Sequence, residues 1–405
     1  MNAFEDAVAA VFREEYGRAV SVVRRTTGDL GFAEDAVQEA FAEATRRWAS
    51  DGVPEQPGAW IILTARRRAV DRFRREAARG GKEAAAALLD ATDDGGAGTL
   101  GDDRLRLLFT CCHPALSMPA RVALALRVVG GLTTTQIASA FLVSEASMGQ
   151  RISRAKAKIR DAHIPYRIPS VQDLPERLSG VLAVIYLIYN EGYSATLGEP
   201  RERAGLCAEA LRLARVVVRL MPEEPEAQGL LALLLLSESR SGVRAGPGRV
   251  LVPLAEQDRS RWNAALIAEG TAIVQTCLAG GRLGPYQLQA AIQAVHAAAP
   301  SAAATDWHRI VRLYDLLFEA APGPVVRLNR AVAVAEAEGP AAALEIVDGL
   351  HLSGYHVFHA VRAELLRRLG RWDDAARELA EAARLAPGAG EKAFLLGKLR
   401  DLQRG

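Results

Sequence analysis

Apolar residues recur at helical spacing along almost the whole of this chain. Between residues 30 and 48 they fall three or four positions apart, which places them on one side of a helix: Ala33, Ala36, Val37, Ala40, Phe41, Ala44 and Trp48. A break with two prolines and two glycines follows at 51–58, and the next helix is predicted from Ala59 to about Ala78. The pattern predicts an all-α protein.

Two stretches poor in apolar periodicity divide the chain. Residues 80–103 are rich in glycine, aspartate and alanine, which predicts a flexible linker with one short helix over 83–89. Prolines at 165, 169 and 175 mark a second junction. We therefore expect five segments: a small helical domain at 1–79, the linker at 80–103, a second small helical domain at 104–165, a Pro-rich junction at 166–178 and a helical extension at 179–405.

The extension contains spacings typical of tetratricopeptide repeats. The clearest unit runs from Val357 to Pro387, with small residues where two helices of a hairpin meet and a proline at the end: Leu369, Gly370, Trp372, Ala375, Ala382 and Pro387. Residues 242–303 fit this repeat poorly. We therefore expect a tetratricopeptide-like domain rather than a regular array, and such domains present concave surfaces to other proteins.

Composition excludes several classes of protein. Half of the 405 residues are apolar and the net charge is only +2, so nucleic-acid binding must be argued from local clusters. The N-terminus lacks the apolar core of a signal peptide, and the longest apolar run, Leu230 to Leu236, is too short to span a membrane. We expect a cytoplasmic protein with no membrane association. The four cysteines suit a reducing compartment, and Cys111-Cys112-His113 has no second ligand pair, so no metal or other cofactor is expected.

Charge is concentrated on two successive helices. The helix at 30–48 carries an acidic face opposite its apolar side, formed by Glu34, Asp35, Gln38, Glu39 and Glu43. The next helix holds eight basic and two acidic residues between Arg66 and Lys82, an excess typical of phosphate binding. Trp60 stands at its start, where an aromatic ring can stack on an unpaired base.

Residues 133–160 have the pattern of a helix-turn-helix. Thr133 and Gln136 form a capping box at the start of a short helix, and Ser144 can cap a longer one. One side of the longer helix is apolar (Met148, Ile152, Ala155, Ile159), and the other is polar and basic (Ser147, Gln150, Arg151, Arg154, Lys158). Glutamine and arginine suit base edges in the major groove, while Lys156, Lys158 and Arg160 suit phosphates.

In this order the parts resemble the extracytoplasmic-function group of sigma-70 factors. The resemblance lies in Ala33 to Phe41, in Trp60 to Arg75 and in Gln136 to Lys156. Further stretches are similar to the subgroup with a C-terminal tetratricopeptide-like extension: 104–116, 190–193, 258–262 and 284–292. Arg67 departs from the family, which usually has asparagine there, as does Gln136, where an acidic residue is usual.

The resemblance implies a role for each stretch. The 33–41 helix would dock on the beta-prime subunit of RNA polymerase through Asp35, Gln38, Glu39 and Phe41. The minus-ten promoter element would be opened by Trp60, Arg66, Arg67, Arg68, Arg72, Arg74 and Arg75. The minus-thirty-five element would be read by Ser144, Ser147, Gln150, Arg151, Arg154, Lys156 and Lys158. The implied partners are the polymerase core (beta-prime and beta subunits) and promoter DNA. The concave surface expected of the extension would serve either as a site for a regulatory protein or as an internal clamp on the sigma domains.

Two other classes of function remain to be weighed. A helix-turn-helix regulator with a repeat sensor domain would need no contact with polymerase. This hypothesis does not explain the acidic face at 34–43 or the basic helix that contains Arg66. An enzyme would need catalytic residues, but the chain has no glycine-rich phosphate loop, no G-x-S-x-G and no H-E-x-x-H. We therefore expect a non-enzymatic sigma factor, whose extension either inhibits it or is required for its activity.

Overall fold

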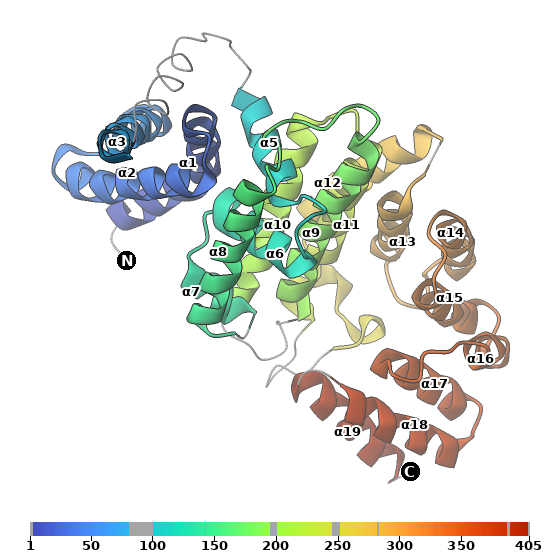
Figure 1. Ribbon diagram of the computed structural model, residues 1–405. Coiled ribbons are helices and arrows are strands. Elements are labelled where there is room, and N and C mark those ends of the chain that lie inside the picture. Colours follow the sequence, from blue (N-terminus) through green and yellow to red (C-terminus); the bar gives the residue numbers. More distant parts are fainter. Residues whose placement is uncertain are drawn as a thin grey trace. The chain divides into compact units, whose positions relative to one another are not determined.

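The computed structural model describes residues 3–80, 100–141, 143–194, 201–244, 252–281, 283–386 and 389–403. Every regular element within these ranges is helical, so the predicted all-α class is confirmed (Figure 1). The chain divides into two compact units, Met1–Ile188 and Tyr189–Gly405. Most of the predicted linker at 80–103, and Pro387 of the clearest repeat, lie outside the described residues.

The first unit begins with three helices, which we call the three-helix part: α1 (Ala3–Thr27), α2 (Leu30–Asp51) and α3 (Pro57–Gly80). Gly28 takes a positive φ of 72° between α1 and α2, and the Asp29 side chain accepts a hydrogen bond of 2.9 Å from the Phe32 amide to begin α2. The apolar side of α2 expected from the sequence is buried against α1 and α3. Of its polar side, Asp35 and Glu39 are exposed, whereas Glu34 is buried.

Residues 100–166 form the helix-turn-helix part. It comprises α5 (Leu100–Cys111), α6 (Met118–Leu124), the π-helical turn η1 (Ala125–Val129), α7 (Thr134–Ala140) and α8 (Glu145–Asp161). The predicted capping box is present: the Thr133 amide donates to Gln136 Oε1 over 2.8 Å, and the Gln136 amide donates to Thr133 Oγ1 over 3.1 Å. The four apolar residues expected on the inner side of α8 are all buried.

The second unit is a succession of helices in which most pack on the next in the chain (Figure 1). Helix α9 (Leu174–Ser194) runs across the boundary between the units and is followed by α10 (Arg201–Leu220). Helix α11 (Pro225–Glu238) is apolar nearly all round and packs on both α12 (Ala264–Ala279) and α13 (Pro285–Ala298). Between and after these lie η3 (Ser241–Val243), η5 (Leu254–Glu256), η6 (Arg259–Arg261), α12 (Ala264–Ala279), α13 (Pro285–Ala298), α14 (Trp307–Ala320) and α15 (Pro324–Ala337).

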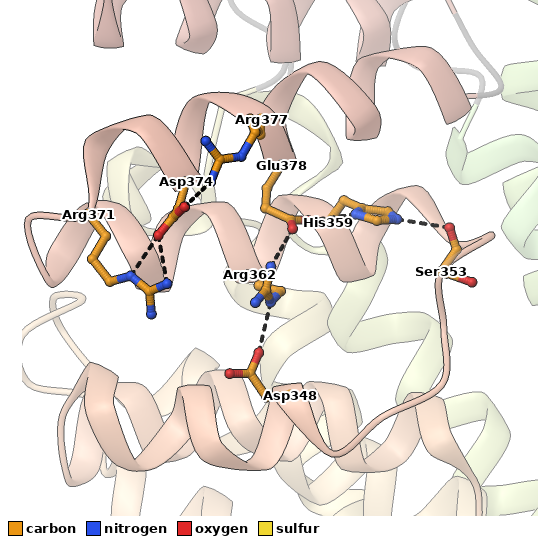
Figure 2. Close-up of polar contacts among 8 residues, drawn as sticks. All are labelled: Asp348, Ser353, His359, Arg362, Arg371, Asp374, Arg377 and Glu378. Carbon is orange, nitrogen blue, oxygen red and sulfur yellow. Dashed lines mark hydrogen bonds and ion pairs between the residues drawn. The ribbon is translucent and has the colours of Figure 1, made fainter.

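The chain ends in helical hairpins: α16 (Pro340–Asp348), α17 (His356–Arg368), α18 (Trp372–Leu385) and α19 (Ala389–Leu402). Figure 2 shows the polar contacts that join three of them. From α17, Arg362 donates to Asp348 of α16 over 2.8 Å and also binds Glu378 of α18. His359 contacts Glu378 over 2.6 Å and the Ser353 carbonyl oxygen over 2.9 Å. The hairpins are therefore fixed by charged groups as well as by apolar packing.

Candidate nucleic-acid interface

Helix α8 presents its predicted reading side outward. Exposed side chains on this helix and at its cap include Ser144, Ser147, Gln150, Arg154 and Lys158, while Arg151 is half-buried. The Ser144 hydroxyl accepts from the Ser147 amide over 3.2 Å and donates to the Ser147 hydroxyl over 2.8 Å. Ser144 therefore caps the helix and stabilises its first turn.

Lys156 is the exception among the predicted minus-thirty-five residues. Its ammonium group lies 2.5 Å from Glu34 Oε2, on the three-helix part. Only about a quarter (24%) of its side chain is exposed. Lys156 thus differs from the other residues of the predicted reading side, because its ammonium group is already paired with the Glu34 carboxylate.

The arginines of the basic helix α3 differ in exposure and in their partners. Arg66 and Arg67 are exposed, whereas Arg68 donates to Glu39 over 3.1 Å and also binds Glu43. The hydrogen bond from Arg68 lowers the pKa of the Glu43 carboxyl below its usual value. Arg72, Arg74 and Arg75 continue the same helix, with side chains outside the described part of the structure. Arg68 is therefore engaged in holding α3 against α2.

Trp60 lies at the start of α3, at the position where base stacking is expected from the sequence. Its ring is half-buried and meets the ring of Trp48 edge to face, with centroids 5.4 Å apart. Trp48 itself is 3% exposed. Trp60 is thus held in place by the core while part of its ring remains accessible, which suits a stacking surface.

The predicted polymerase-binding residues on α2 differ in their access to a partner. Asp35 and Glu39 are exposed, and Gln38 donates to Glu34 over 2.9 Å. Phe41 is 5% exposed and packs on Phe12, with ring centroids 4.6 Å apart. Asp35 and Glu39 therefore form the outer surface of α2, and Phe41 supports it from within.

Glu34 is expected from the sequence to lie on the acidic face of α2, but it is not among the predicted polymerase-binding residues. It is 2% exposed, and its Oε1 accepts a hydrogen bond of 2.5 Å from Arg127 Nε of η1. With Lys156 on its other oxygen, Glu34 binds two cations of the helix-turn-helix part in addition to Gln38 of its own helix. No sequence pattern indicates this pairing, because Arg127 lies 93 positions further along the chain.

The cysteines have the environment of buried apolar groups. All four are free and buried, and burial raises the pKa of the Cys112 thiol to about 12. In the part of the chain that the structure describes, no cluster of three histidine, cysteine or acidic side chains is arranged to hold a metal ion. No described helix is long and apolar enough to cross a membrane.

Comparison with known proteins identifies three segments. Residues 11–79 match the model of sigma-70 region 2, residues 106–159 match that of sigma-70 region 4, and residues 177–278 match a family of unknown function, DUF6596. The two sigma matches coincide with the three-helix part and the helix-turn-helix part. The third covers the beginning of the extension.

Similar proteins match either nearly the whole chain or 162 residues of it. An uncharacterized protein of Rhizobium meliloti (strain 1021) is 44% identical over 396 residues, which cover 95% of this chain and 93% of that protein. The ECF RNA polymerase sigma factor SigK of Mycobacterium ulcerans is 30% identical over 162 residues, 39% of this chain and 82% of SigK. SigK of Mycobacterium tuberculosis (strain H37Rv) is 32% identical over 162 residues, 38% of this chain and again 82% of that protein.

Proposed function

This chain belongs to the ECF family of RNA polymerase sigma factors, and from that membership we propose that it divides promoter recognition among three helices. Helix α8 would read the minus-thirty-five element, α3 would open the minus-ten element, and α2 would dock on the polymerase core. The exposed polar side of α8 carries the proposal, because a capped helix with exposed glutamine and arginine side chains fits the major groove.

For the minus-ten element, α3 offers two exposed arginines beside an accessible aromatic ring. Arg66 and Arg67 can hold phosphates while a flipped base stacks on Trp60. Extruding a base costs a few kcal/mol, which stacking and phosphate contacts must offset. Because Trp60 is fixed against Trp48, little further ordering of the ring is needed when the base arrives.

For polymerase, the exposed carboxylates of α2 provide the docking surface. Asp35 and Glu39 face outward along one side of the helix, and a basic surface on the beta-prime subunit would complement them. Each promoter contact can be weak, since polymerase fixes the spacing of the two DNA-binding parts and converts the second contact into an intramolecular one.

For the extension, we propose control of the sigma parts in cis or through a bound protein. The support is physical continuity: Arg177, near the start of α9, donates a hydrogen bond of 2.6 Å to the Phe109 carbonyl oxygen of α5. A rearrangement of the extension that moves the start of α9 would act directly on the helix-turn-helix part.

Polymerase capture by the full chain tests the sigma assignment against an ordinary regulator. The charge reversal Asp35→Lys with Glu39→Lys is expected to abolish binding of core polymerase. The matched reversal Glu345→Lys, on an exposed residue of α16, is expected to leave it intact. Equal capture of core by both variants, or no capture by the unaltered chain, would favour the regulator that needs no polymerase.

A further inference from the structure

The two DNA-binding parts of the first unit are packed directly on each other. Helix α1 contacts α5 and η1. At the closest point, a Cβ added to Gly17 would lie 2.7 Å from the Val129 carbonyl oxygen. No larger residue fits there without movement of the backbone, so glycine at 17 permits this approach.

Charged groups cross the same interface at Glu34. This carboxylate is 2% exposed and lies 2.5 Å from both Arg127 Nε and Lys156 Nζ, which we call the Glu34 cluster. Arg127 also donates to the Leu132 carbonyl oxygen over 2.9 Å, so it is held in position on its own side. A carboxylate removed from water needs such partners, because an unpaired buried charge is strongly unfavourable.

Polar contacts near the other end of α1 add to the interface. The Tyr166 hydroxyl lies 2.9 Å from the Ser21 carbonyl oxygen and 3.0 Å from that of Asp103. Arg25 forms an ion pair of 3.3 Å with the Asp103 carboxylate. Interfaces rich in charged and polar groups are typical of parts that separate and rejoin rather than of permanent cores.

A cavity shows that the interface is not sealed. It has a volume of about 570 Å³ and lies between the turn joining α1 to α2 and the C-terminal half of α8. Lys156 is among its lining residues, together with Arg24, Asp29 and Arg160. Water can therefore reach the edge of the Glu34 cluster, where separation of the two parts can begin.

We propose that this packing is a closed state in which Glu34 withholds Lys156 from DNA, and that the chain must open before it can use both promoter elements. The effect of opening on DNA binding rests on the proposed function. The existence of the closed state does not, because it depends only on contacts within the chain. Lys156 cannot neutralise a phosphate while it neutralises Glu34, so the two contacts compete.

The distance that the closed state can span also indicates that the chain must open. The two elements are separated by about 25 base pairs, or about 85 Å of B-form DNA at about 3.4 Å per pair. In the closed state, the path runs from Gln150 to Lys156 along α8 and from Glu34 to Trp48 along α2, which is about 30 Å at about 1.5 Å per helical residue. The side-chain contacts from Lys156 to Glu34 and from Trp48 to Trp60 lengthen it to at most about 60 Å. The reading helix and the base-stacking ring therefore cannot occupy both elements together without separation of the two parts.

Distance measurement on the full chain tests the closed state without DNA or polymerase. Spin labels are attached to cysteines introduced at Ala49 and Ala162, exposed residues near the ends of α2 and α8, while the four native cysteines are buried. Glu34→Gln is expected to shift the distance distribution to longer values. Glu43→Gln is the matched control, since Glu43 lies on the same helix and binds Arg68 within the three-helix part.

Gly17→Ala provides a second, independent way to open the interface. Alanine favours the helix more than glycine does, yet its methyl group collides with the Val129 backbone, so this variant should fold and open. The proposal is overturned if Glu34→Gln and Gly17→Ala both keep the unaltered distance distribution with unchanged helix content.

DNA binding tests the second half of the proposal. Freeing Lys156 should steepen the dependence of log affinity on log salt by about 0.9 for duplex DNA in the Glu34→Gln variant. Longer distances with an unchanged salt dependence would show that Glu34 does not withhold Lys156. Failure of the unaltered chain to support transcription would instead reject the proposed function and leave the distance result standing.

Discussion

Arg177 donates a hydrogen bond of 2.6 Å to the carbonyl oxygen of Phe109, so α9, the helix that leads into the extension, begins in contact with the helix-turn-helix part. Burial lowers the pKa of the Arg177 guanidinium from its usual value, which is the mark of a charge partly withdrawn from water. Control by the extension could be tested by deleting the residues from Pro175 onward, but this deletion would also remove the contact between Arg177 and Phe109. Loss of activity in such a truncated chain would then have two causes.

A substitution at Arg177 separates these causes. Arg177→Met keeps the aliphatic part of the side chain and removes the donor, so it is expected to destabilise the helix-turn-helix part by about 2 kcal/mol. Hydrogen exchange of the amides in α5 and α6 measures this directly, with Arg167→Met at an exposed position as control. Unchanged exchange in Arg177→Met would mean that the contact adds nothing to the stability of the helix-turn-helix part.

The cap of α8 gives a prediction that distinguishes folding from DNA contact. Ser144→Ala should destabilise the helix by about 1 kcal/mol, because the Ser147 amide loses its acceptor. Ser144→Asp should keep that stability, since aspartate caps equally well, yet weaken DNA binding by adding negative charge beside the phosphates. Thermal unfolding and DNA affinity of both variants would be compared. Equal DNA affinity of Ser144→Asp and the unaltered chain would remove Ser144 from the DNA interface.

His296 should make the second unit sensitive to mild acid. It is buried on α13 beside Trp307, with ring centroids 5.2 Å apart, and burial with the nearby cations Arg240 and Arg259 lowers its pKa from 6.5 to about 4. Because the folded pKa is the lower one, the stabilisation is present above pH 6.5 and is lost as the pH falls toward 4.

The measurement for His296 is urea unfolding at two pH values. Between pH 7 and pH 5 the unaltered chain should lose about 2 kcal/mol of stability through this residue. His296→Leu should lose about 2 kcal/mol less over the same interval, whereas His308→Leu, at an exposed position of α14, should behave as the unaltered chain does. If the free energy of unfolding changed equally with pH in all three proteins, His296 would not be a buried, neutral histidine.

Two glycines test the repeat geometry of the extension. Gly370 has a φ of 75° between α17 and α18, so Gly370→Ala should cost about 1 to 2 kcal/mol. Gly205 lies within α10 with no heavy atom within 4 Å of an added Cβ, so Gly205→Ala should be neutral or stabilising by up to about 1 kcal/mol. Thermal unfolding of the pair is the test, and equal midpoints for the two variants would contradict it.

Local patterns in the sequence predicted the elements well, because the interactions that form them are local. The capping box at Thr133 and Gln136 spans four residues, and the buried side of α8 follows from helical periodicity alone. The outward placement of Gln150 and Arg154 follows from the same periodicity, since polar residues opposite a buried side must face water.

Pairings between distant segments could not be predicted in this way. Arg68 has the same surroundings in the sequence as Arg67, yet it is bound by Glu39 and Glu43 because of how α3 lies on α2. Lys156 matches the pattern of a phosphate contact, and only the packing of the helix-turn-helix part on the three-helix part brings Glu34 to it. Such ion pairs depend on the tertiary arrangement, which cannot be predicted from helical periodicity.

Transcription in vitro tests the central claim most directly. The full chain is the sole specificity factor added to core polymerase on a pool of genomic promoter fragments. Discrete transcripts are expected, and Arg151→Ala with Arg154→Ala should reduce them tenfold or more, since each good contact to a base contributes about 1 to 3 kcal/mol of discrimination. The control pair Arg377→Ala with Arg384→Ala, on exposed residues of α18, should leave them unchanged. Absence of transcripts, with sequence-specific DNA binding retained by the protein alone, would contradict the assignment as a sigma factor.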